Sequence, residues 1–308
     1  MTAPRVVFVL VAYNQARWVR QACEAALNQD YSPLEILFSD DASTDDTFAI
    51  MQAVADDYRG PHRLRLNRNT QNLGLIHHVN HLHELADADL LVVAAGDDIS
   101  LPTRTSALVQ AFRAAAGRAY SFHSAVQTID EQGQVTGLWR PPLTELQPDP
   151  AHWMTSMSTL IGASHAWTRE LFTSFGPICQ QGAYEDLVLA YRAMLLGGLQ
   201  YLDTPLVQYR QNIGLASGPR GLSRYDRLMR SLNLKIAVFE QRRLDCLTVG
   251  RGDLATSLAE TVAGLQLRRD ILLKQCDLLT SLRTARQGGL VPTWLRAHAE
   301  RVRYALFD

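Results

Sequence analysis

Two pairs of adjacent aspartates stand where apolar runs of the sequence end. Asp40 and Asp41 close the segment "LEILFSDD", and Asp97 and Asp98 close the segment "LLVVAAGDD". Paired carboxylates at the end of a buried run repel one another and resist the loss of water. Each pair therefore needs a partner that offsets its charge. A carboxylate held near a reacting proton can also serve as an acid or a base.

The surrounding sequence predicts the elements that hold these acids. Continuous apolar, β-branched runs are typical of parallel strands, and helical spacing of apolar residues marks the segments between them. The expected order is strand 6–11, helix 16–28, strand 34–41, a helix after "STDDT", strand 63–67, helix 76–85 and strand 90–95. We expect Ser43 or Thr44 to cap the helix after "STDDT", with Asp45 and Asp46 in its first turn. This alternation predicts an α/β fold, a mainly parallel open sheet with helices on both faces.

Polar side chains stand at three of the predicted strand ends: Tyr13–Asn14, Asp40–Asp41 and Asp97–Asp98. Ligands of open α/β sheets bind in the crevice beyond the carboxyl ends of the strands. The coincidence of these three ends predicts a ligand site there. No GxGxxG follows the first strand, which argues against a dinucleotide-binding loop.

Four segments of the chain, in this order, resemble the signatures of the family 2 glycosyltransferases. They are "VVFVLVAYNQARWVRQACEAALNQDYSPLEILFSDDASTDDT", "NTQNLGLIHHVNHLHELADADLLVVAAGDD", "AYEDLVLAYRAML" and "VQYRQNIGLAS", and the resemblance covers roughly residues 5–218. The resemblance implies a GT-A fold that binds a nucleotide sugar. It also implies a transfer of the sugar with inversion at its anomeric carbon.

The resemblance also assigns residues to the donor. The nucleotide-sugar-binding residues it implies are Ala12, Tyr13, Asn14, Asp41, Asn72, Gly74, Asp97 and Arg210. Tyr13 would stack on or edge the base, and Asp41 would accept the N–H of a pyrimidine such as uracil or thymine. Asp97 would contact the ribose or a metal-bound water, and Asp40 would be structural. Asp98 would bind a divalent cation, Mg²⁺ or Mn²⁺, that neutralises the acids and bridges the diphosphate.

The segment "GAYEDLVLAYR" carries the catalytic residues that the resemblance implies. Asp186 would take the proton of the acceptor hydroxyl in a single in-line displacement, and Glu185 would position it or the acceptor. Glu185, Leu189 and Arg192 share one face of a predicted helix. By itself the pair is also compatible with a helix N-terminus, where the dipole favours acids.

Arg210 lies in the segment "VQYRQNIGLAS", which stands where the family has a loop over the diphosphate. The planar guanidinium of Arg210 fits a phosphate contact. Asn212 occupies the position at which the family usually has a histidine.

The histidine cluster in "GLIHHVNHLHEL" suggests a metal site as an alternative role for the segment after Gly74. His77 and His81 are spaced as a zinc pair, but no further ligand is evident in the sequence. We expect one or two of the four histidines to line the donor pocket and the rest to face solvent.

The chain changes character after residue 220. Apolar residues at helical spacing predict two long amphipathic helices separated near Gly250. They could form a hairpin packed on the catalytic domain or a homodimer interface. The final segment, "VPTWLRAHAERVRYALF", mixes apolar residues with arginines, so it could dock on its own protein or on an anionic membrane. We expect a catalytic domain at 1–220 and a C-terminal α-helical extension at 221–308.

The composition of the chain limits which classes of function are possible. The 308 residues include 30 basic and 31 acidic ones, so no global charge favours nucleic acid. Four scattered cysteines and no export or membrane-spanning segment predict a cytoplasmic enzyme, with peripheral contact at the inner face of the membrane open. The expected activity is metal-dependent sugar transfer from a UDP- or dTDP-linked donor to a saccharide or lipid-linked acceptor in cell-surface polysaccharide or glycoconjugate synthesis. The alternatives are a nucleotidyltransferase and a non-catalytic protein that binds sugar nucleotides or serves assembly.

Overall fold

The structure is a computed structural model that describes residues 4–211, 213, 221–273 and 277–307. The chain divides into two compact units. The first comprises residues 1–181 and 185–218, and the second comprises residues 182–184 and 219–308. The boundary expected after residue 220 adjoins residues 214–220, which lie outside the described ranges.

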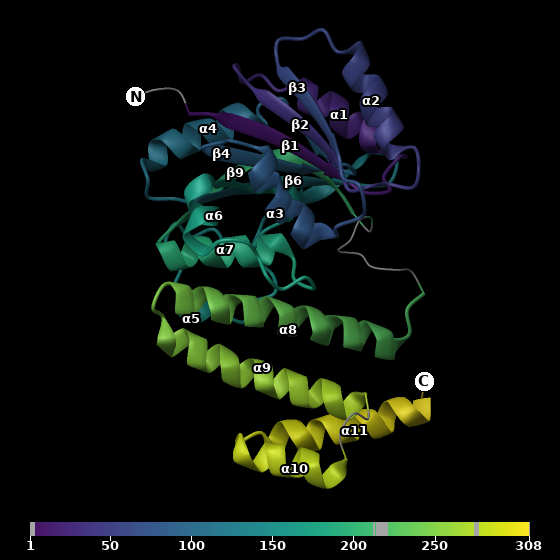
Figure 1. Ribbon diagram of the computed structural model, residues 1–308, viewed down its shortest axis with the longest axis vertical. Helices are drawn as coiled ribbons and strands as arrows, with labels where there is room; N and C mark the ends of the chain where they lie inside the picture. Colours follow the sequence, from purple (N-terminus) through teal and green to yellow (C-terminus); the bar gives the residue numbers. More distant parts are fainter. Residues whose placement is uncertain (1–3, 212, 214–220, 274–276, 308) are drawn as a thin grey trace. The chain divides into compact units, whose positions relative to one another are not determined.

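A nine-stranded sheet forms the centre of the first unit (Figure 1). Its strands are β1 (Val6–Ala12), β2 (Glu35–Asp40), β3 (Arg63–Arg68), β4 (Leu90–Ala95), β5 (Ile99–Ser100), β6 (Ser121–Ile129), β7 (Val135–Trp139), β8 (Ala166–Thr168) and β9 (Leu199–Arg210). The order is β3-β2-β1-β4-β8-β6-β9-β5, with β7 paired to β6. The predicted parallel pairing holds from β3 to β4. Beyond β4 the sheet is mixed, because β8 runs antiparallel to both β4 and β6.

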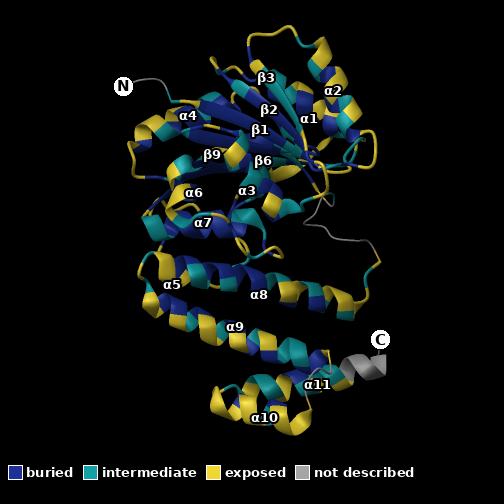
Figure 2. Cartoon of the chain, in the orientation of Figure 1, coloured by how far each residue is buried: buried dark blue, intermediate teal, exposed yellow. Residues whose placement is uncertain are grey.

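Three helices cover one face of the parallel strands. These are α1 (Val19–Leu27), α2 (Thr47–Asp57) and α4 (Arg104–Ala115). Alternate strand residues such as Phe8, Leu10 and Phe38 are buried in one cluster with Cys23 of α1 and Leu108 of α4. Figure 2 shows the central strands as the most buried part of the unit, as expected of continuous apolar strands.

Helix α3 (Leu75–Leu85) covers the opposite face of β2. Its His78 lies 2.7 Å from the Oγ of Ser39, measured from Nε2, and Ser39 is oriented away from its neighbour Phe38. The remaining helices of this unit are α5 (Pro150–Trp153), the 3₁₀ turn η1 (Gly162–Ser164), α6 (Arg169–Phe175) and α7 (Glu185–Leu196). Figure 1 shows α3, α6 and α7 on the same side of the sheet. Helices therefore lie on both faces, as predicted.

The predicted cap of α2 is wrong. The helix begins at Thr47 with Asp46 as its N-cap, and no side chain makes a capping bond. Asp45 instead accepts hydrogen bonds from the backbone N–H and the hydroxyl of Thr47, at 3.0 and 2.5 Å. Ser43 and Thr44 are turned toward the end of β1, because their groups bond Asn14.

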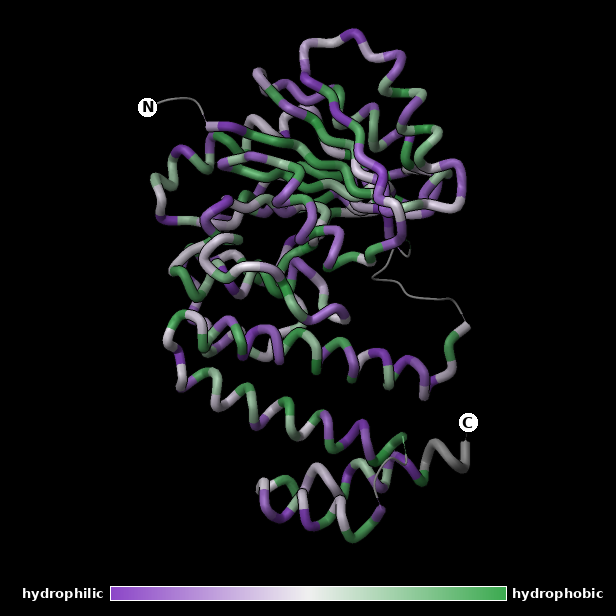
Figure 3. Tube along the Cα trace, viewed as in Figure 1, coloured by the Kyte–Doolittle hydropathy of each residue, from purple (hydrophilic) through white to green (hydrophobic). Residues whose placement is uncertain are grey.

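Four helices make up most of the second unit. They are α8 (Arg224–Thr248), α9 (Gly252–Leu272), α10 (Leu278–Gln287) and α11 (Val291–Phe307). The two predicted long helices correspond to α8 and α9, and Gly250, with φ of 75°, lies between them. Figure 3 shows hydrophobic and hydrophilic residues alternating along all four, as amphipathic helices require.

Two apolar clusters hold these helices together. Met229 and Leu232 of α8 pack with Leu272 of α9, and Trp294 of α11 packs on a cluster that includes Ile271 of α9. No helix in the described ranges has the length and hydrophobicity of a membrane span.

Candidate active site

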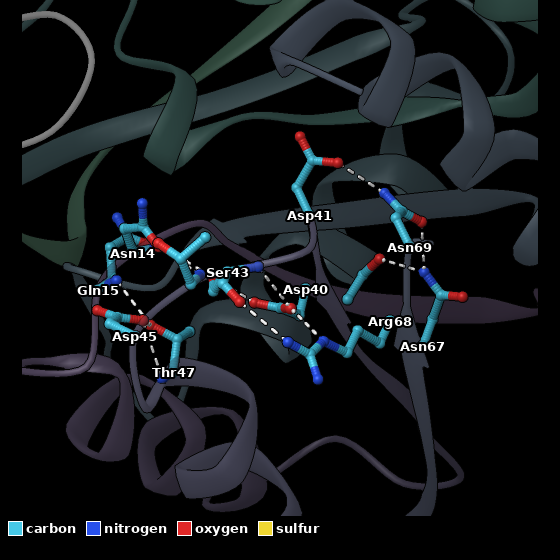
Figure 4. A network of polar contacts seen from close by, with 12 residues as sticks. Asn14, Gln15, Asp40, Asp41, Ser43, Asp45, Thr47, Asn67, Arg68 and Asn69 are labelled. Carbon is cyan, nitrogen blue, oxygen red and sulfur yellow. Dashed lines mark hydrogen bonds and ion pairs between the residues drawn. The ribbon is translucent and has the colours of Figure 1, made fainter. Parts of the chain in front are cut away.

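The ends of β1 and β2 are joined by a polar network (Figure 4). Asn14 has a φ of 52°, a left-handed conformation that asparagine tolerates better than most residues. Its backbone N–H donates to the Oγ of Ser43 at 2.9 Å, and its Oδ1 accepts from the N–H of Thr44 at 2.9 Å. The neighbouring Tyr13 stays 38% exposed, so its ring is accessible to a ligand. Ala12 is buried, and its carbonyl accepts from the N–H of Asp41 at 2.9 Å.

Asp40 is fully enclosed by donors from its own turn and from β3. Its Oδ2 accepts from the N–H of Ser43 at 3.0 Å, and its Oδ1 accepts from the Ser43 hydroxyl at 2.5 Å. The guanidinium of Arg68 lies 3.4 Å from Oδ2. These contacts agree with the structural role expected of Asp40.

Asp41 anchors the loop that connects β3 to α3. One carboxylate oxygen accepts from the side chain of Asn69 at 2.8 Å and from the N–H of Leu73 at 2.9 Å, and the other accepts from the N–H of Gly74 at 2.9 Å. Gly74 has a φ of 76°, and the side chain of Asn72 accepts from the same N–H. Three predicted donor-binding residues, Asp41, Asn72 and Gly74, are therefore brought together. A carboxylate offers about four acceptor positions, and three donors of the described residues bond Asp41.

The turn of Asp97 and Asp98 packs closely on the end of β1. A Cβ on Gly96 would lie 2.6 Å from the Oε1 of Gln15 and 2.9 Å from the Cβ of Ala12, so only glycine fits this approach. The side chain of Gln15 hydrogen-bonds Asp97. Gln15 was not among the predicted site residues, although it follows Asn14 directly.

Both aspartates of this turn are buried, at 6% and 5% exposure. Burial raises the pKa of Asp97, and burial together with the charge of Asp97 raises the pKa of Asp98 well above its usual range. Arg210 opposes both shifts. Its backbone N–H donates to the Oδ1 of Asp98 at 2.7 Å.

The guanidinium of Arg210 is itself buried and bonded to protein acceptors. It donates to the carbonyls of Asp97, Asp130 and Glu131 and to the side chain of Gln21, at 2.8–3.0 Å. In this arrangement the residue holds the acidic turn in place. Its predicted phosphate contact stays a prediction, and Asn212 lies outside the described residues.

A second arginine, Arg104 of α4, lies beneath the acidic turn. It is fully buried, and burial lowers its pKa to about 9 although Asp98 opposes the shift. Its guanidinium donates to the Oγ of Ser100 at 2.9 Å and to the carbonyl of Val93 at 2.6 Å. No sequence motif singled out Arg104, because an arginine in a helix is usually a solvated residue.

Glu185 and Asp186 form the first turn of α7 and face η1. Burial, and then the charge of Asp186, raise the pKa of Glu185 to about 8. The Oδ2 of Asp186 accepts from the N–H of Gly162 at 3.2 Å, and its Oδ1 accepts from the N–H of Leu187 at 2.7 Å. A Cβ on Gly162 would lie 2.7 Å from the Oε1 of Glu185. Gly162 thus lies directly against both acids, which no local sequence pattern revealed.

Tyr209 of β9 links the acidic turn to the start of α7. Burial raises the pKa of its hydroxyl to about 12, and the charges of Asp98, Asp97 and Asp186 add to the shift. Three of the predicted site carboxylates, Asp97, Asp98 and Asp186, therefore act electrostatically on one side chain.

The histidines of α3 have different environments, and whether any of them lines a donor pocket stays a prediction. His78 bonds Ser39, and His81 bonds Glu84 at 2.7 Å. His83 accepts from the indole of Trp167 at 3.0 Å and stacks on Phe172. Among the described residues, no three His, Cys, Asp or Glu side chains are grouped to hold a metal ion.

Comparisons with a family model and with known proteins indicate the same family. The model of the family described as Glycosyl transferase family 2 matches residues 7–168. The putative glycosyltransferase EpsE of Bacillus subtilis is 34% identical over 103 residues, which are 33% of this chain and 36% of that protein. The chondroitin synthase of Escherichia coli is 43% identical over 49 residues, 16% of this chain and 7% of that protein. The chain thus matches about a third or less of the length of these relatives.

Solved structures share the fold at low identity. A structure of residues 1–349 of S. aureus TarS in complex with UDP-GlcNAc has a TM-score of 0.58 and 16% identity, covering 97% of this chain and 81% of that one. The mannosyltransferase PcManGT of Pyrobaculum calidifontis, in complex with GDP-Man and Mn²⁺, has a TM-score of 0.54 and 16% identity, covering 98% and 88%. The predicted GT-A fold is confirmed.

Proposed function

The chain belongs to glycosyl transferase family 2, and from this premise we propose that it moves a sugar from a UDP- or dTDP-linked donor to a hydroxyl acceptor, with inversion and with a divalent cation. Sugar transfer itself follows from the family. The donor, metal and mechanism are proposals. The observation that carries them is the pair of buried carboxylates Asp97 and Asp98 at the end of β4, where the N–H of Arg210 bonds Asp98.

The acceptor position that the three described donors leave on Asp41 supports a pyrimidine base. Uracil and thymine present one imide N–H between two carbonyls, which fits one open lone pair on a carboxylate already bonded by three donors. Guanine presents an N–H and an adjacent amine and would need two acceptor positions. Since one structural neighbour carries UDP-GlcNAc and another GDP-Man, the fold alone does not select between these bases.

The chemistry of the acidic turn fits a hard divalent cation. Mg²⁺ and Mn²⁺ favour oxygen ligands, and Mg²⁺ in particular is commonly held by one or two carboxylates together with substrate phosphates. Asp98 and Asp97 would hold the ion, with the diphosphate and water completing its shell. When bound, the cation would offset the repulsion between these aspartates and the negative charge of the leaving diphosphate.

The environments of Glu185 and Asp186 support a division of roles. The raised pKa of Glu185 favours its protonated form at neutral pH. Asp186 accepts two backbone N–H bonds, which fix the orientation of its carboxylate. Asp186 would therefore remove the acceptor proton, while Glu185 orients Asp186 or the acceptor.

The acceptor proposed is a saccharide or a lipid-linked saccharide of cell-surface polysaccharide or glycoconjugate synthesis. The support is the similarity to a chondroitin synthase, which is confined to 49 residues.

A donor panel tests the proposed function. The chain is incubated with UDP-, dTDP-, GDP- and CDP-linked sugars and Mn²⁺ or Mg²⁺, and released nucleoside diphosphate is measured with and without a chelator. We expect metal-dependent release from UDP or dTDP donors, enhanced by saccharide acceptors. Release that is unaffected by the chelator, or that is fastest with GDP donors, would contradict the metal or the base assignment. Donor binding without any turnover across acceptors would favour the non-catalytic alternative.

A further inference from the structure

Exposed apolar side chains gather on the last two helices. Five of the ten exposed large hydrophobic residues of the described chain lie between residues 273 and 302: Leu273, Leu278, Leu279, Leu295 and Val302. Figure 2 shows α10 as a largely exposed helix. We call the exposed side chains of α10 and α11 in residues 278–302 the terminal face. Its exposed apolar residues are not members of either apolar cluster described for this unit.

Helix α11 has two distinct faces. Trp294 and Ala297 point inward, where they pack with Ile271, and the indole of Trp294 donates to the Oγ of Ser281 at 2.9 Å. Outward lie Leu295, Ala299 and Val302, spaced by four and three residues and therefore on one side of the helix. Leu295 is 58% and Val302 is 59% exposed. The outward side is thus an apolar stripe on a helix that is already anchored by its other side.

The terminal face is also cationic. Residues 277–302 contain four arginines, Arg283, Arg286, Arg296 and Arg301, and two acids, Asp277 and Glu300. Both acids are engaged within the unit: Asp277 caps α10 by accepting from the N–H groups of residues 279 and 280, and Glu300 accepts two bonds from Arg268 at 2.7 and 2.8 Å. None of the four arginines makes an ion pair within 4.0 Å of an acid in the described part of the chain.

We propose that the terminal face binds an anionic lipid surface, with α11 lying in the plane of the headgroups. An interfacial helix inserts apolar side chains at the boundary of the acyl chains and presents cations to lipid phosphates. Leu295, Ala299 and Val302 supply the apolar stripe, and Arg296 adjoins it. A second copy of the chain suits this face less well, because a symmetric contact would bring unpaired arginines together. Lipid phosphates instead neutralise them.

This inference goes beyond the proposed function and does not depend on it, since lipid binding is measured without donor or acceptor. The full chain is sedimented with vesicles of phosphatidylcholine alone and with vesicles of equal parts phosphatidylcholine and phosphatidylglycerol, at low and at high salt. We expect binding to the anionic vesicles only, weakened by salt because screening reduces the attraction of the arginines. Glycosyl transfer to a soluble acceptor provides a separate readout, so failure of either proposal leaves the other measurable.

Two variants separate the apolar and the cationic contributions. Leu295→Glu combined with Val302→Glu should lower the partition into anionic vesicles by roughly a hundredfold, since each apolar side chain contributes about tenfold. Arg296→Gln combined with Arg283→Gln should lower it by roughly twentyfold, at about fivefold per arginine. The matched controls are Leu247→Glu and Arg224→Gln, exposed positions of α8 that should bind vesicles like the parent.

Three outcomes would overturn the proposal. They are an absence of sedimentation with anionic vesicles at low salt, equal losses in the control variants, and binding that survives both pairs of substitutions. Light scattering at matched concentrations adds a fourth: if the parent self-associates, the Leu295 and Val302 variant does not, and neither binds vesicles, the terminal face joins copies of the chain. Circular dichroism of each variant shows that its helices are retained.

Discussion

The ends of β2 and β4 each carry two adjacent aspartates that are buried to a similar extent. The two pairs differ in the hydrogen-bond donors that contact them. Asp40 and Asp41 are 0% and 4% exposed, and Asp97 and Asp98 are 6% and 5% exposed. At β2, six donors bond the two carboxylates, from Ser43, Asn69, Leu73, Gly74 and Arg68. At β4 there are fewer: the N–H of Arg210 bonds Asp98, and a backbone N–H and the side chain of Gln15 favour the charge of Asp97.

The difference teaches that burial alone does not show which acid pair still lacks hydrogen-bond donors. A buried carboxylate satisfied by hydrogen bonds needs no further partner, whereas one left with few donors disfavours its own charge. At β4 the raised pKa values of both aspartates express that deficit. A cation would remove it. The same reasoning applies to α7, where burial raises the pKa of Glu185.

The largest expected effect is the loss of turnover on substitution of Asp186. Asp186→Asn should lower kcat by roughly 10²- to 10⁴-fold, the usual contribution of a positioned general base. UDP affinity should stay nearly unchanged, because Asp186 acts on the acceptor. Initial rates at saturating donor and calorimetry with UDP measure the two quantities. Turnover within a few-fold of the parent would remove Asp186 from the base role, with Glu185→Gln as the next variant.

Asp98→Asn should weaken Mn²⁺-dependent binding of UDP by about 10²-fold or more, exceeding the 10- to 100-fold typical of outer partners of a metal ligand. In the absence of metal the same variant should have a higher Tm than the parent at alkaline pH, because the amide cannot acquire the buried charge that the carboxyl acquires on losing its proton. Calorimetry and thermal unfolding in a chelator check both effects. A variant that binds UDP and Mn²⁺ like the parent would place the cation elsewhere.

Asp41→Asn should erase the preference for UDP over CDP, a change of roughly tenfold or more in the ratio of affinities. An asparagine can donate to the N3 of cytosine, whereas the carboxylate can only accept from the N–H of uracil. Competition against a labelled UDP ligand measures the ratio. A uniform loss of affinity with an unchanged ratio would show that Asp41 only anchors its loop.

Asp40→Asn supplies the opposite half of the comparison. Losing the bonds with Ser43 and Arg68 should lower the free energy of unfolding by about 1–3 kcal/mol, while UDP binding and its metal dependence persist. Urea titration without metal at alkaline pH measures the free energy of unfolding of Asp40→Asn, and the same titration of Asp98→Asn gives the comparison. If Asp40→Asn lowers the free energy of unfolding while Asp98→Asn raises it, the distinction between the ends of β2 and β4 is supported. If both variants change it in the same direction, the distinction fails.

A last effect is a pH dependence of stability from Glu185. Its folded pKa, about 8, exceeds the usual value of 4.5, so the native state retains a proton that the unfolded state releases across this range. The contribution of Glu185 to stability therefore falls as pH rises from about 4.5 to about 8. Thermal unfolding should show a decline in Tm, roughly 2–4 °C per kcal/mol lost, and Glu185→Gln should flatten it. An identical slope in parent and variant would assign the decline to other groups.

Sequence patterns predicted the part of the fold that is locally encoded. The strands and helices up to Ala95 follow from continuous apolar runs and helical spacing, and β4 occupies the predicted residues. The mixed half of the sheet was not predicted, because β8 and β5 have three and two residues and leave almost no periodicity to detect. Antiparallel placement of β8 against β4 is decided by tertiary packing.

The predicted site residues were found by residue type at strand ends and by resemblance, and their supports were missed. Tyr209 and Gly162 act on residues distant along the chain, Asp98 and Asp186 respectively, while Arg104 is near Asp98 in sequence but carries no motif that marks it as buried. Ser43 shows the reverse error, since a local rule made it a helix cap while Asn14, 29 positions earlier, decides its orientation. Local sequence rules predict the wrong contact where a residue distant in sequence forms the hydrogen bond instead.

The pairing of β9 has a consequence for how the chain is made. Asp98 receives its backbone bond from Arg210, 112 positions later, and β6 pairs in parallel with β9 along most of its length. During synthesis, the segment matched by the family model, residues 7–168, is complete before β9 emerges. Until then the acidic turn lacks its arginine and β6 has an open edge, which invites pairing with other chains. A nascent chain that stalls after residue 168 should therefore be inactive and prone to aggregate, although it carries the sequence by which the family is identified.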